Sequence, residues 1–349
     1  MRSGEELVAM SEDRLRKIFG EGKPDWLSEL AQVGLADDDV VAVLDTQSYF
    51  DLLELPYPET RSGVVDRLFR ERLIARHEGM LAITNLGAIL FAKRLEDVDL
   101  ARKAPRVIVY DGVGKTKTKQ DTRFSKGYAV AFANLVDFVN SVIPSNEVIE
   151  AALRRETKMF PTIAIRELLA NALIHQDFEE RGASVVVEVY SDRLAISSPG
   201  KPFIPTDRFI DEYQSRNERL ADLMRRLRIC EEKGSGIDKV ITAVEAYQLP
   251  APDIRATDTR TTVVLFGHKD FAAMDRSERV RACYQHCCLR YVMNEKMTNQ
   301  SLRTRFELPE TKAETVSRII KDTIEEGKVK LVDPESTSKR YAKYVPFWA

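Results

Sequence analysis

The stretch from Phe160 to Phe178, FPTIAIRELLANALIHQDF, most strongly constrains how this chain folds. Pro161 suits the first turn of a helix, where the N–H that proline lacks would have no partner anyway. Apolar residues then recur at helical spacing. They are Ile163, Leu168, Leu169, Ala172 and Leu173. The pattern predicts one amphipathic helix that buries an apolar face.

The same helix carries an unusual set of polar groups on one side. Glu167 and Asn171 are four residues apart, His175 is four further on, and Asp177 follows where the helix is expected to end. A carboxylate can orient or deprotonate water, and an amide oxygen is a hard ligand for Mg²⁺. The row therefore suits work around a metal–phosphate group. A helix with a solvated polar face is the alternative, and this stretch alone does not decide between the two.

Two glycine turns follow the helix in the sequence. The first is Ser198–Pro199–Gly200, at the end of a predicted strand, and the second is Lys233–Gly234–Ser235–Gly236, at the start of a predicted helix. A glycine turn that opens a helix offers free N–H groups and the positive end of the helix dipole to a phosphate. Such turns are common helix caps as well. Together with the polar helix, however, they form the elements of a nucleotide pocket without a P-loop.

A P-loop is excluded by spacing. The letters GKT at Gly114–Lys115–Thr116 would require a glycine at position 109, which is Val109. The residues after Thr116 are polar and predict no helix. We therefore expect a strand at 106–110 followed by a basic surface loop.

The remaining pattern predicts an α+β fold in which helices cover a sheet. A small helical unit with a short hairpin is expected at 44–95, and helices are expected at 127–143 and 220–229. Residues 146–156 are expected to continue in helical form into the polar helix. Strands are expected at 106–110, 183–192, 193–200 and 261–268.

The end of the chain predicts a different unit. A helix over 276–294 is followed by a short helix capped by Thr298, then by a helix over 312–326 for which Thr311 and Glu314 form a capping box. Gly327 ends that helix, and 328–332 and 341–345 alternate as two short strands. Three helices and a hairpin are the winged-helix pattern, and the third helix would be its recognition helix. Its candidate DNA contacts are Lys312, Ser317, Arg318 and Lys321.

The distribution of charge gives weak support to a winged helix that binds DNA. The net charge is −2, but the chain from Arg276 onwards holds 15 Lys and Arg against 10 Asp and Glu, which leaves −7 on the remainder. A basic terminal unit on an acidic body points to nucleic acid. A winged helix that docks onto protein is the alternative.

Cysteine content and hydropathy indicate the cell compartment in which this chain is expected. Cys283, Cys287 and Cys288 cluster beside His286, but no CxxC pair is present, so reduced structural thiols are favoured over zinc. No apolar run approaches the roughly 20 residues that span a bilayer, and the first residues contain no signal-peptide core. We expect a cytoplasmic protein without a membrane partner.

Several of these motifs resemble one family in the same order. IRELLANALIHQDF, DRLAISSPG, SRNERLADLMRRL and EEKGSGIDKV look like the GHKL-type ATPase domain of the Schlafen/AlbA-associated, "RecG-like" ATP-binding proteins. The resemblance extends through ITNLGAILFAK before them and through RACYQHCCLRYV, MTNQSLRTRF and KYVPFWA after them. It implies an ATP-binding protein or transcriptional regulator with a C-terminal helix-turn-helix.

The resemblance also implies residue roles. Glu167 matches the carboxylate that orients water, and Asn171 matches the Mg²⁺-binding amide. Gly200 matches the glycine of the first nucleotide-binding loop, and Gly234 and Gly236 match the second, with Ser235 between them. His175 and Asp177 would lie beside the nucleotide. The implied cofactors are ATP and Mg²⁺.

The chain departs from the family at two places. GHKL proteins carry an Asp just before the first glycine to bind the adenine amino group, whereas Ser198 is nearest here. Exchanging a charge-assisted hydrogen bond, worth about 1.5–3 kcal/mol, for a neutral one of roughly half that value weakens ATP binding or relaxes base selection. Residues 1–43 look like only the tail of an AlbA-like domain, so nuclease activity is not expected.

These observations predict a remnant of an AlbA-like domain at 1–43, a connector unit at 44–95, a GHKL-like helix/sheet sandwich at 96–270 and a winged helix at 271–349. The predicted function is an ATP- and DNA-binding transcription regulator. Nucleotide would order a lid formed by the loop from Lys201 to Arg219. Weak ATP hydrolysis and a homodimer are left open. The alternative function is a non-enzymatic DNA- or protein-binding module with a degenerate pocket.

Overall fold

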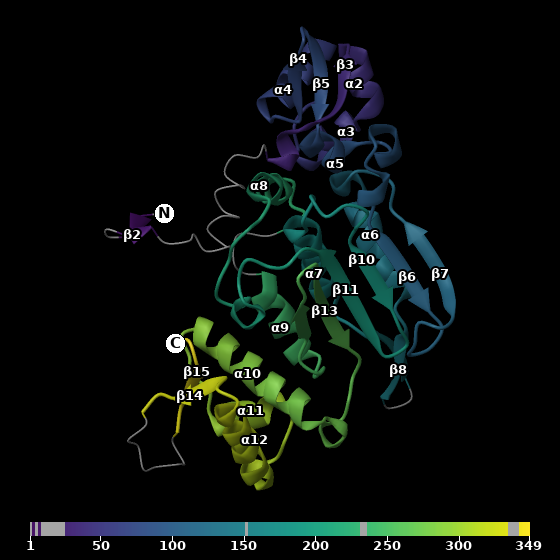
Figure 1. The fold of residues 1–349 in the computed structure, drawn as a ribbon. Coiled ribbons are helices and arrows are strands. Elements are labelled where there is room, and N and C mark those ends of the chain that lie inside the picture. The colour runs from purple at the N-terminus through teal and green to yellow at the C-terminus, as the bar shows by residue number, and fades with distance from the viewer. Residues whose placement is uncertain (1, 4–5, 8–24, 151–152, 231–235, 334–341) are drawn as a thin grey trace.

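The computed structural model is elongated, with three units arranged along its length (Figure 1). It describes residues 2–3, 6–7, 25–150, 153–230, 236–333 and 342–349. Side chains of 145–150 and 153–157 are not described. Two short strands precede the first unit, β1 (Arg2–Ser3) and β2 (Glu6–Leu7). Residues 1, 4–5 and 8–24 of the segment expected to be an AlbA-like remnant lie outside the described residues.

The first unit packs four helices against a three-stranded antiparallel sheet of order β3-β5-β4. Each of three helices begins at a side-chain cap, because Asp45, Thr60 and Thr84 accept a hydrogen bond from a backbone N–H in the first turn. The elements are β3 (Leu30–Leu35), α2 (Asp37–Val43), α3 (Thr46–Leu52), α4 (Arg61–Arg70), β4 (Ile74–His77), β5 (Met80–Thr84) and α5 (Asn85–Phe91).

Residues before position 44 belong to the same small unit as those after it. β3 pairs with β5, with Leu30 opposite Thr84 and Leu35 opposite Leu81. Leu35 and Val40 are buried in the same core as the helices of 44–95. A strand of a sheet is stabilised by its partner strand, so this part of 1–43 folds with the unit expected at 44–95.

The central unit is a mixed six-stranded sheet of order β12-β13-β11-β10-β6-β7. Only β10 and β6 run parallel, and the other neighbours are antiparallel. The strands are β6 (Arg106–Tyr110), β7 (Thr118–Arg123), β10 (Val186–Val189), β11 (Arg193–Pro199), β12 (Asp253–Ala256) and β13 (Arg260–Phe266). Helices α6 (Tyr128–Val142), α7 (Thr162–His175), α8 (Glu218–Arg226) and α9 (Gly236–Ala246) complete the unit.

Successive side chains of a strand point to opposite faces of the sheet, and the packing of β11 residues shows which face the helices cover. Leu194 and Ile196 of β11 join the main core with residues of α6 and α7. Ala195, between them, joins a small cluster on the other face with Tyr190 and Val264. The expected α+β sandwich of helices on a sheet is confirmed. The basic surface loop expected after residue 110 is interrupted by a strand, because β7 forms within it.

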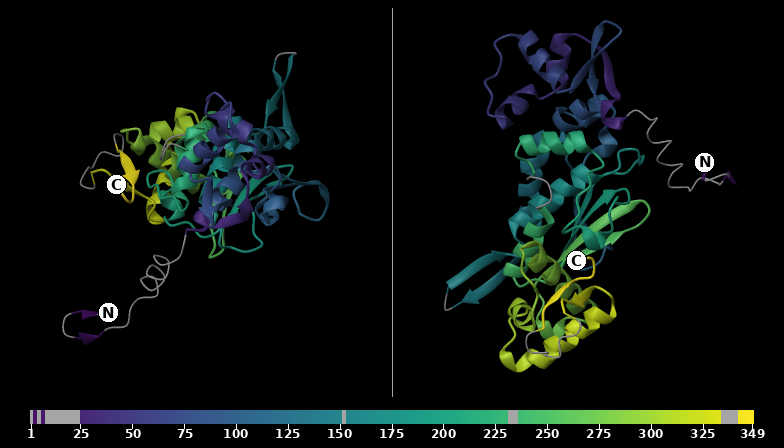
Figure 2. Two further views of the ribbon diagram at one scale, coloured as in Figure 1. Left: turned by 90° about the horizontal axis from the view of Figure 1, so that it is seen from above. Right: turned by 90° about the vertical axis from the view of Figure 1, so that its left-hand side faces the viewer.

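Residues 146–156 do not continue as a helix into α7, as expected. They form two antiparallel strands, β8 (Ser145–Glu150) and β9 (Leu153–Lys158), with Ser145 opposite Lys158. The hairpin projects from the body of the molecule in both views of Figure 2. Alanine, glutamate and arginine are good helix formers, but helix propensity is a weak determinant that strand pairing outweighs here.

The last unit has three helices and a short hairpin, in the expected order. These are α10 (Arg276–Val292), α11 (Asn299–Arg305), α12 (Ala313–Glu325), β14 (Val329–Leu331) and β15 (Tyr344–Pro346). Thr298 caps α11 as predicted. The predicted capping box at Thr311 is wrong, because a 3₁₀ turn, Glu310–Lys312, precedes α12 and the side chain of its N-cap, Lys312, makes no capping bond.

The cysteines of α10 are structural in this fold. Cys283, Cys287 and Cys288 are free thiols buried in the core of the last unit. Among the residues that the structure describes, no group of three or more His, Cys, Asp and Glu side chains is placed to hold a metal ion.

Candidate nucleotide-binding site

α7 lies in the middle of the central unit and presents its polar side to a pocket. The helix starts after Pro161, which is the N-cap residue, and ends at His175. Asn217 fixes its end, because the side-chain amide donates to the carbonyl oxygens of Ile174 at 2.7 Å and Gln176 at 2.8 Å. Buried apolar residues hold the opposite side against the sheet.

The pocket brings together five of the predicted site residues. Glu167, Asn171 and His175 of α7 line it with Ser198 of β11 and Gly236 at the start of α9. Strand β13 adds Thr261 and Val263, which the sequence reasoning did not identify. Gly234 and Ser235 lie outside the described residues. The structure therefore assembles a single cavity from elements that are up to 100 residues apart in the chain.

Glu167 is buried rather than solvated. Its exposed fraction is 2%, and its Oε1 atom has no hydrogen-bond partner in the described part of the chain. Burial raises the pKa of this carboxyl, and the charges of Lys239 and Arg166 oppose the rise. A buried carboxylate oxygen without a partner costs stability. A solvated polar face therefore does not describe this side of α7.

Gly236 allows α9 to begin directly against the polar pair of α7. A Cβ atom at this position would lie 3.1 Å from Glu167 Oε2 and 3.3 Å from Asn171 Nδ2. A side chain at this position would require these two groups to shift by a few tenths of an ångström. The positive end of the α9 dipole thus faces the carboxylate and the amide, which is an arrangement suited to an anionic ligand.

Gly200 and Asp177 form the link between α7 and the first glycine turn. Gly200 has φ +95°, and a Cβ atom there would lie 2.6 Å from Asp177 Cβ. The Asp177 N–H donates to the Pro199 carbonyl oxygen at 2.9 Å. Asp177 and Gly200 are not among the residues that line the pocket. They shape the turn that supports Ser198.

Asp177 also holds Arg216. The carboxylate Oδ2 lies 2.9 Å from Arg216 Nη1, and Arg216 Nη2 donates to the Lys201 carbonyl oxygen at 2.7 Å. The guanidinium stacks on Phe203, 4.2 Å from the ring centroid. These contacts tie both ends of the segment between β11 and α8 to the end of α7.

His175 is neutral at neutral pH. Burial, and secondly the charge of Arg216, lower its pKa to about 4. Its ring meets the edge of Tyr213, with 5.8 Å between centroids. A neutral imidazole has one donor and one acceptor nitrogen, so His175 can hydrogen-bond a polar ligand without adding charge.

One wall of the pocket is the segment 201–217, which connects β11 to α8. It includes a short 3₁₀ turn, Thr206–Arg208. The segment was expected to act as a lid, and it does border the pocket, although its aromatic contribution was not foreseen. Its lining residues are Lys201, Pro202, Phe203, Ile204, Phe209, Glu212, Tyr213, Gln214 and Arg216.

At the Ser198 end of the pocket, the paired residues Ser198 and Thr261 carry uncharged hydroxyl groups. Ser198 is 7% exposed and pairs across the sheet with Thr261. Thr261 Oγ1 donates to the Gly200 carbonyl oxygen at 2.9 Å. Hydroxyl groups at this end offer neutral hydrogen bonds only, which agrees with the absence of an Asp before Gly200.

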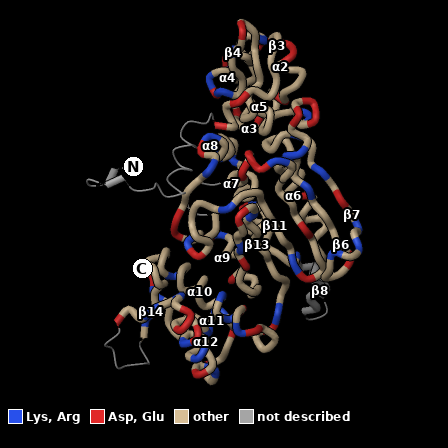
Figure 3. Tube along the Cα trace, in the orientation of Figure 1, with Lys and Arg blue, Asp and Glu red and all other residues tan. Residues whose placement is uncertain are grey.

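The candidate DNA contacts lie on α12 and on the 3₁₀ turn before it. Lys312, Ser317, Arg318 and Lys321 are all exposed. Ser317 Oγ accepts a hydrogen bond from Asn299 at 3.0 Å, and Lys321 lies 3.5 Å from Glu325. Acidic and basic residues are both present along α12 (Figure 3). The positive charge of this face is therefore moderate.

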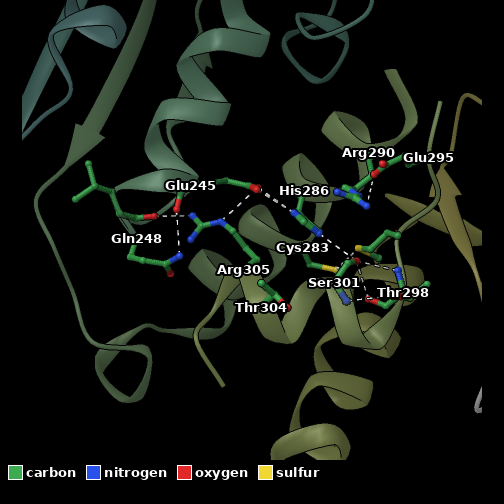
Figure 4. Close-up of polar contacts among 12 residues, drawn as sticks. Glu245, Gln248, Cys283, His286, Arg290, Glu295, Thr298, Ser301, Thr304 and Arg305 are labelled. Atoms are coloured by element: carbon green, nitrogen blue, oxygen red, sulfur yellow. Dashed lines mark hydrogen bonds and ion pairs between the residues drawn. The ribbon is translucent and has the colours of Figure 1, made fainter. Parts of the chain in front are cut away.

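The central and last units meet at the end of α9 (Figure 4). Glu245 lies 3.0 Å from His286 Nδ1 and 3.3 Å from Arg305 Nε. Arg305 Nη2 donates to the Leu249 carbonyl oxygen at 2.6 Å, and His286 Nε2 lies 3.2 Å from Ser301 Oγ. The helix that begins at the pocket therefore ends in a buried polar contact with the last unit.

The fold is a mixed α+β sandwich that is compatible with a GHKL-like ATPase domain. Residues 182–265 match a family model described as "Putative ATP-dependent DNA helicase recG C-terminal". The match supports a RecG-like, GHKL-type ATPase family and an ATP-binding domain. The matched range contains Ser198 and Gly200, the segment 201–217 and Gly236.

Comparison with solved structures supports the fold. The crystal structure of the DIP2311 protein from Corynebacterium diphtheriae is similar with a TM-score of 0.56 at 17% sequence identity, over 87% of this chain. This chain spans 61% of that structure's length. A search of curated proteins finds no match. Within the described ranges, no helix combines the length and apolar character needed to cross a membrane.

Proposed function

We propose that the pocket between α7, β11 and α9 binds ATP with Mg²⁺. The observation that carries the proposal is the meeting of Glu167, Asn171 and Gly236. A buried carboxylate oxygen with no partner among the described residues and an amide are placed against a helix start, where a Cβ atom at Gly236 would lie 3.1 Å from the carboxylate. A bound ligand would supply a polar partner for Glu167 Oε1, which has none in the described part of the chain.

The residues present fit a magnesium nucleotide. The Asn171 side-chain oxygen is a hard ligand for the ion, and the α9 start near Gly236, with Gly234 and Ser235, would hold phosphate oxygens. When bound, Mg²⁺ neutralises phosphate charge. Glu167 would orient a water molecule, and its raised pKa favours accepting a proton. Ser198 and His175 would meet the base end with neutral hydrogen bonds.

We further propose that the last unit is a winged helix that binds DNA, and that nucleotide in the pocket regulates it. The helix order and hairpin support this, as does the exposed row of Lys312, Ser317, Arg318 and Lys321. Such a protein would act as a transcription regulator. Phosphate contacts make DNA affinity fall with salt, so an affinity that is absent or independent of salt would contradict this part.

Thermal unfolding with and without ATP–Mg²⁺ tests the nucleotide site. A working pocket stabilises the fold by about 2.7 kcal/mol at a hundredfold excess over Kd. Asn171→Ala should abolish the stabilisation, because it removes the ion ligand. Asn299→Ala, a change of the same kind in α11, should leave it intact. No stabilisation of the wild-type chain at millimolar ATP would refute the proposal.

A non-enzymatic module with a degenerate pocket is the second candidate. The neutral Ser198 end favours it, since a GHKL site would hold the base through a carboxylate. This candidate predicts no thermal shift with ATP–Mg²⁺ together with intact DNA or protein binding. The same titration therefore separates the two functions.

A further inference from the structure

The segment 201–217 contacts two units at once. Through Phe203, Tyr213 and Arg216 it borders the pocket. At its 3₁₀ turn, Thr206–Arg208, it contacts the last unit. Both contacts lie within one stretch between fixed ends, because Gly200 is bonded to Thr259 and Asn217 to the end of α7.

Asp207 is held from the last unit by two side chains. Lys328 Nζ, just before β14, donates to Asp207 Oδ2 at 2.6 Å. The Tyr284 hydroxyl of α10 donates to the Asp207 backbone carbonyl at 2.6 Å. Trp348 Nε1 in turn donates to the Tyr284 oxygen at 3.2 Å. We call Tyr284, Lys328 and Trp348 the clamp.

The neighbouring residue adds to the same contact. The Arg208 guanidinium lies 4.7 Å from the centroid of the Trp348 ring. Tyr284 is 7% exposed, so its hydroxyl has little water available as a substitute partner. Losing the Tyr284 bond therefore costs more than losing the half-exposed Lys328 ion pair alone.

We propose that the clamp holds the segment 201–217 in position over the pocket, so that the last unit sets the affinity of the pocket for nucleotide. A wall that is already in place costs less ordering free energy when a ligand binds. By reciprocity, nucleotide that orders the segment tightens the clamp. The inference rests on the proposed function for its ligand, but the mechanical link is independent of any ligand.

The test is a double variant with a matched control. Tyr284→Phe with Lys328→Met removes both bonds to Asp207 without touching a pocket residue. Tyr291→Phe with Lys330→Met makes the same two changes on α10 and β14, away from Asp207. We expect the clamp variant to raise the Kd for ATP–Mg²⁺ about 5-fold, while the control variant changes it less than about 2-fold.

A second variant changes Asp207, the residue of the segment 201–217 that makes the contact. Asp207→Asn removes the ion pair and keeps the backbone carbonyl that Tyr284 contacts. It should weaken ATP binding by a smaller factor in the wild-type chain. It should add little in the Lys328→Met background, because both changes remove the same pair. Additive losses in the two backgrounds would overturn the clamp.

Hydrogen exchange separates this inference from the proposed function. Without nucleotide, amides of 201–217 should exchange faster in the clamp variant than in the control variant. If the wild-type chain does not bind ATP, the proposed function fails while exchange still decides the link. Equal exchange in both variants, or tighter ATP binding by the clamp variant, would overturn the inference.

Discussion

Two glutamates in this molecule have opposite surroundings. Glu167 of α7 is 2% exposed, and its Oε1 atom has no partner in the described structure. The Glu245 side chain of α9 is 16% exposed and lies within ion-pair distance of both His286 and Arg305. The better buried carboxylate is thus the one with fewer partners.

The difference separates a ligand-facing group from a structural one. Arg305, 4% exposed, would be a buried charge without its carboxylate, so Glu245 compensates a cost inside the protein. Glu167 faces the pocket beside Gly236, and burial keeps its pKa raised although the charges of Lys239 and Arg166 oppose the rise. Carboxyl groups whose pKa is perturbed by burial are typical of functional sites. Substitution of either glutamate, or of residues around it, tests whether this distinction holds.

The largest effect is expected from Glu245→Ala. It leaves Arg305 buried without its acidic partner and His286 without its Nδ1 partner. We expect the last unit to lose about 3 kcal/mol of stability, the lower end for a broken buried pair, because Glu245 is partly exposed. Urea unfolding followed by the fluorescence of Trp348, in a Trp26→Phe background, measures this loss.

A surface pair provides the control. Glu325→Ala removes the partner of Lys321 in an exposed ion pair. Such pairs contribute about 0–1 kcal/mol, so its effect should be well below that of Glu245→Ala. Equal losses from the two variants would mean that the contact at the end of α9 is no stronger than a surface pair.

The two sites also differ in how far the sequence could predict them. Glu167, Asn171 and His175 are four residues apart on one helix, so helical geometry alone places them together. Gly236 and Ser198 were found because glycine turns mark special backbone positions. Glu245, His286 and Arg305 come from three helices and are joined only by tertiary packing, which leaves no local pattern.

The absence of a local sequence pattern also explains the other differences between the predicted and the observed structure. Thr261 and Tyr213 line the pocket through sheet register and the path of a loop, and neither is visible in spacing. The helix expected at 146–156 gave way to a hairpin, since strand pairing depends on residues beyond a local window. The order of elements in the last unit was predictable because caps, helical periodicity and Gly327 are all local signals.

A smaller effect is expected from His175→Gln. Burial, and secondly the charge of Arg216, lower the pKa of His175 to about 4. The unfolded chain takes up this proton near pH 6.5. Between these values the unfolded state therefore binds more protons, and stability falls as pH falls.

The measurement compares unfolding free energies at pH 7.5 and pH 5. The wild-type chain should lose about 1–2 kcal/mol more than His175→Gln over this interval, after allowing for partial solvent exposure. The variant removes the titrating group and keeps a polar side chain in the pocket. A wild-type pH dependence that equals that of the variant would show that His175 is not kept neutral by burial.

The smallest effect on stability is expected from Glu167→Gln, the counterpart of Glu245→Ala. Glutamine keeps the shape of the side chain and removes the charge whose burial raises the pKa of Glu167. Since Oε1 has no partner to lose among the described residues, the free energy of unfolding should stay the same or rise by up to about 1 kcal/mol. ATP–Mg²⁺ should still stabilise the variant, because Asn171 and the α9 start are unchanged. Any hydrolysis by the wild-type chain should fall about 100-fold or more, as expected for the loss of a general base. A destabilisation as large as that of Glu245→Ala would place Glu167 among the structural carboxylates and remove the main reason for locating a ligand beside it.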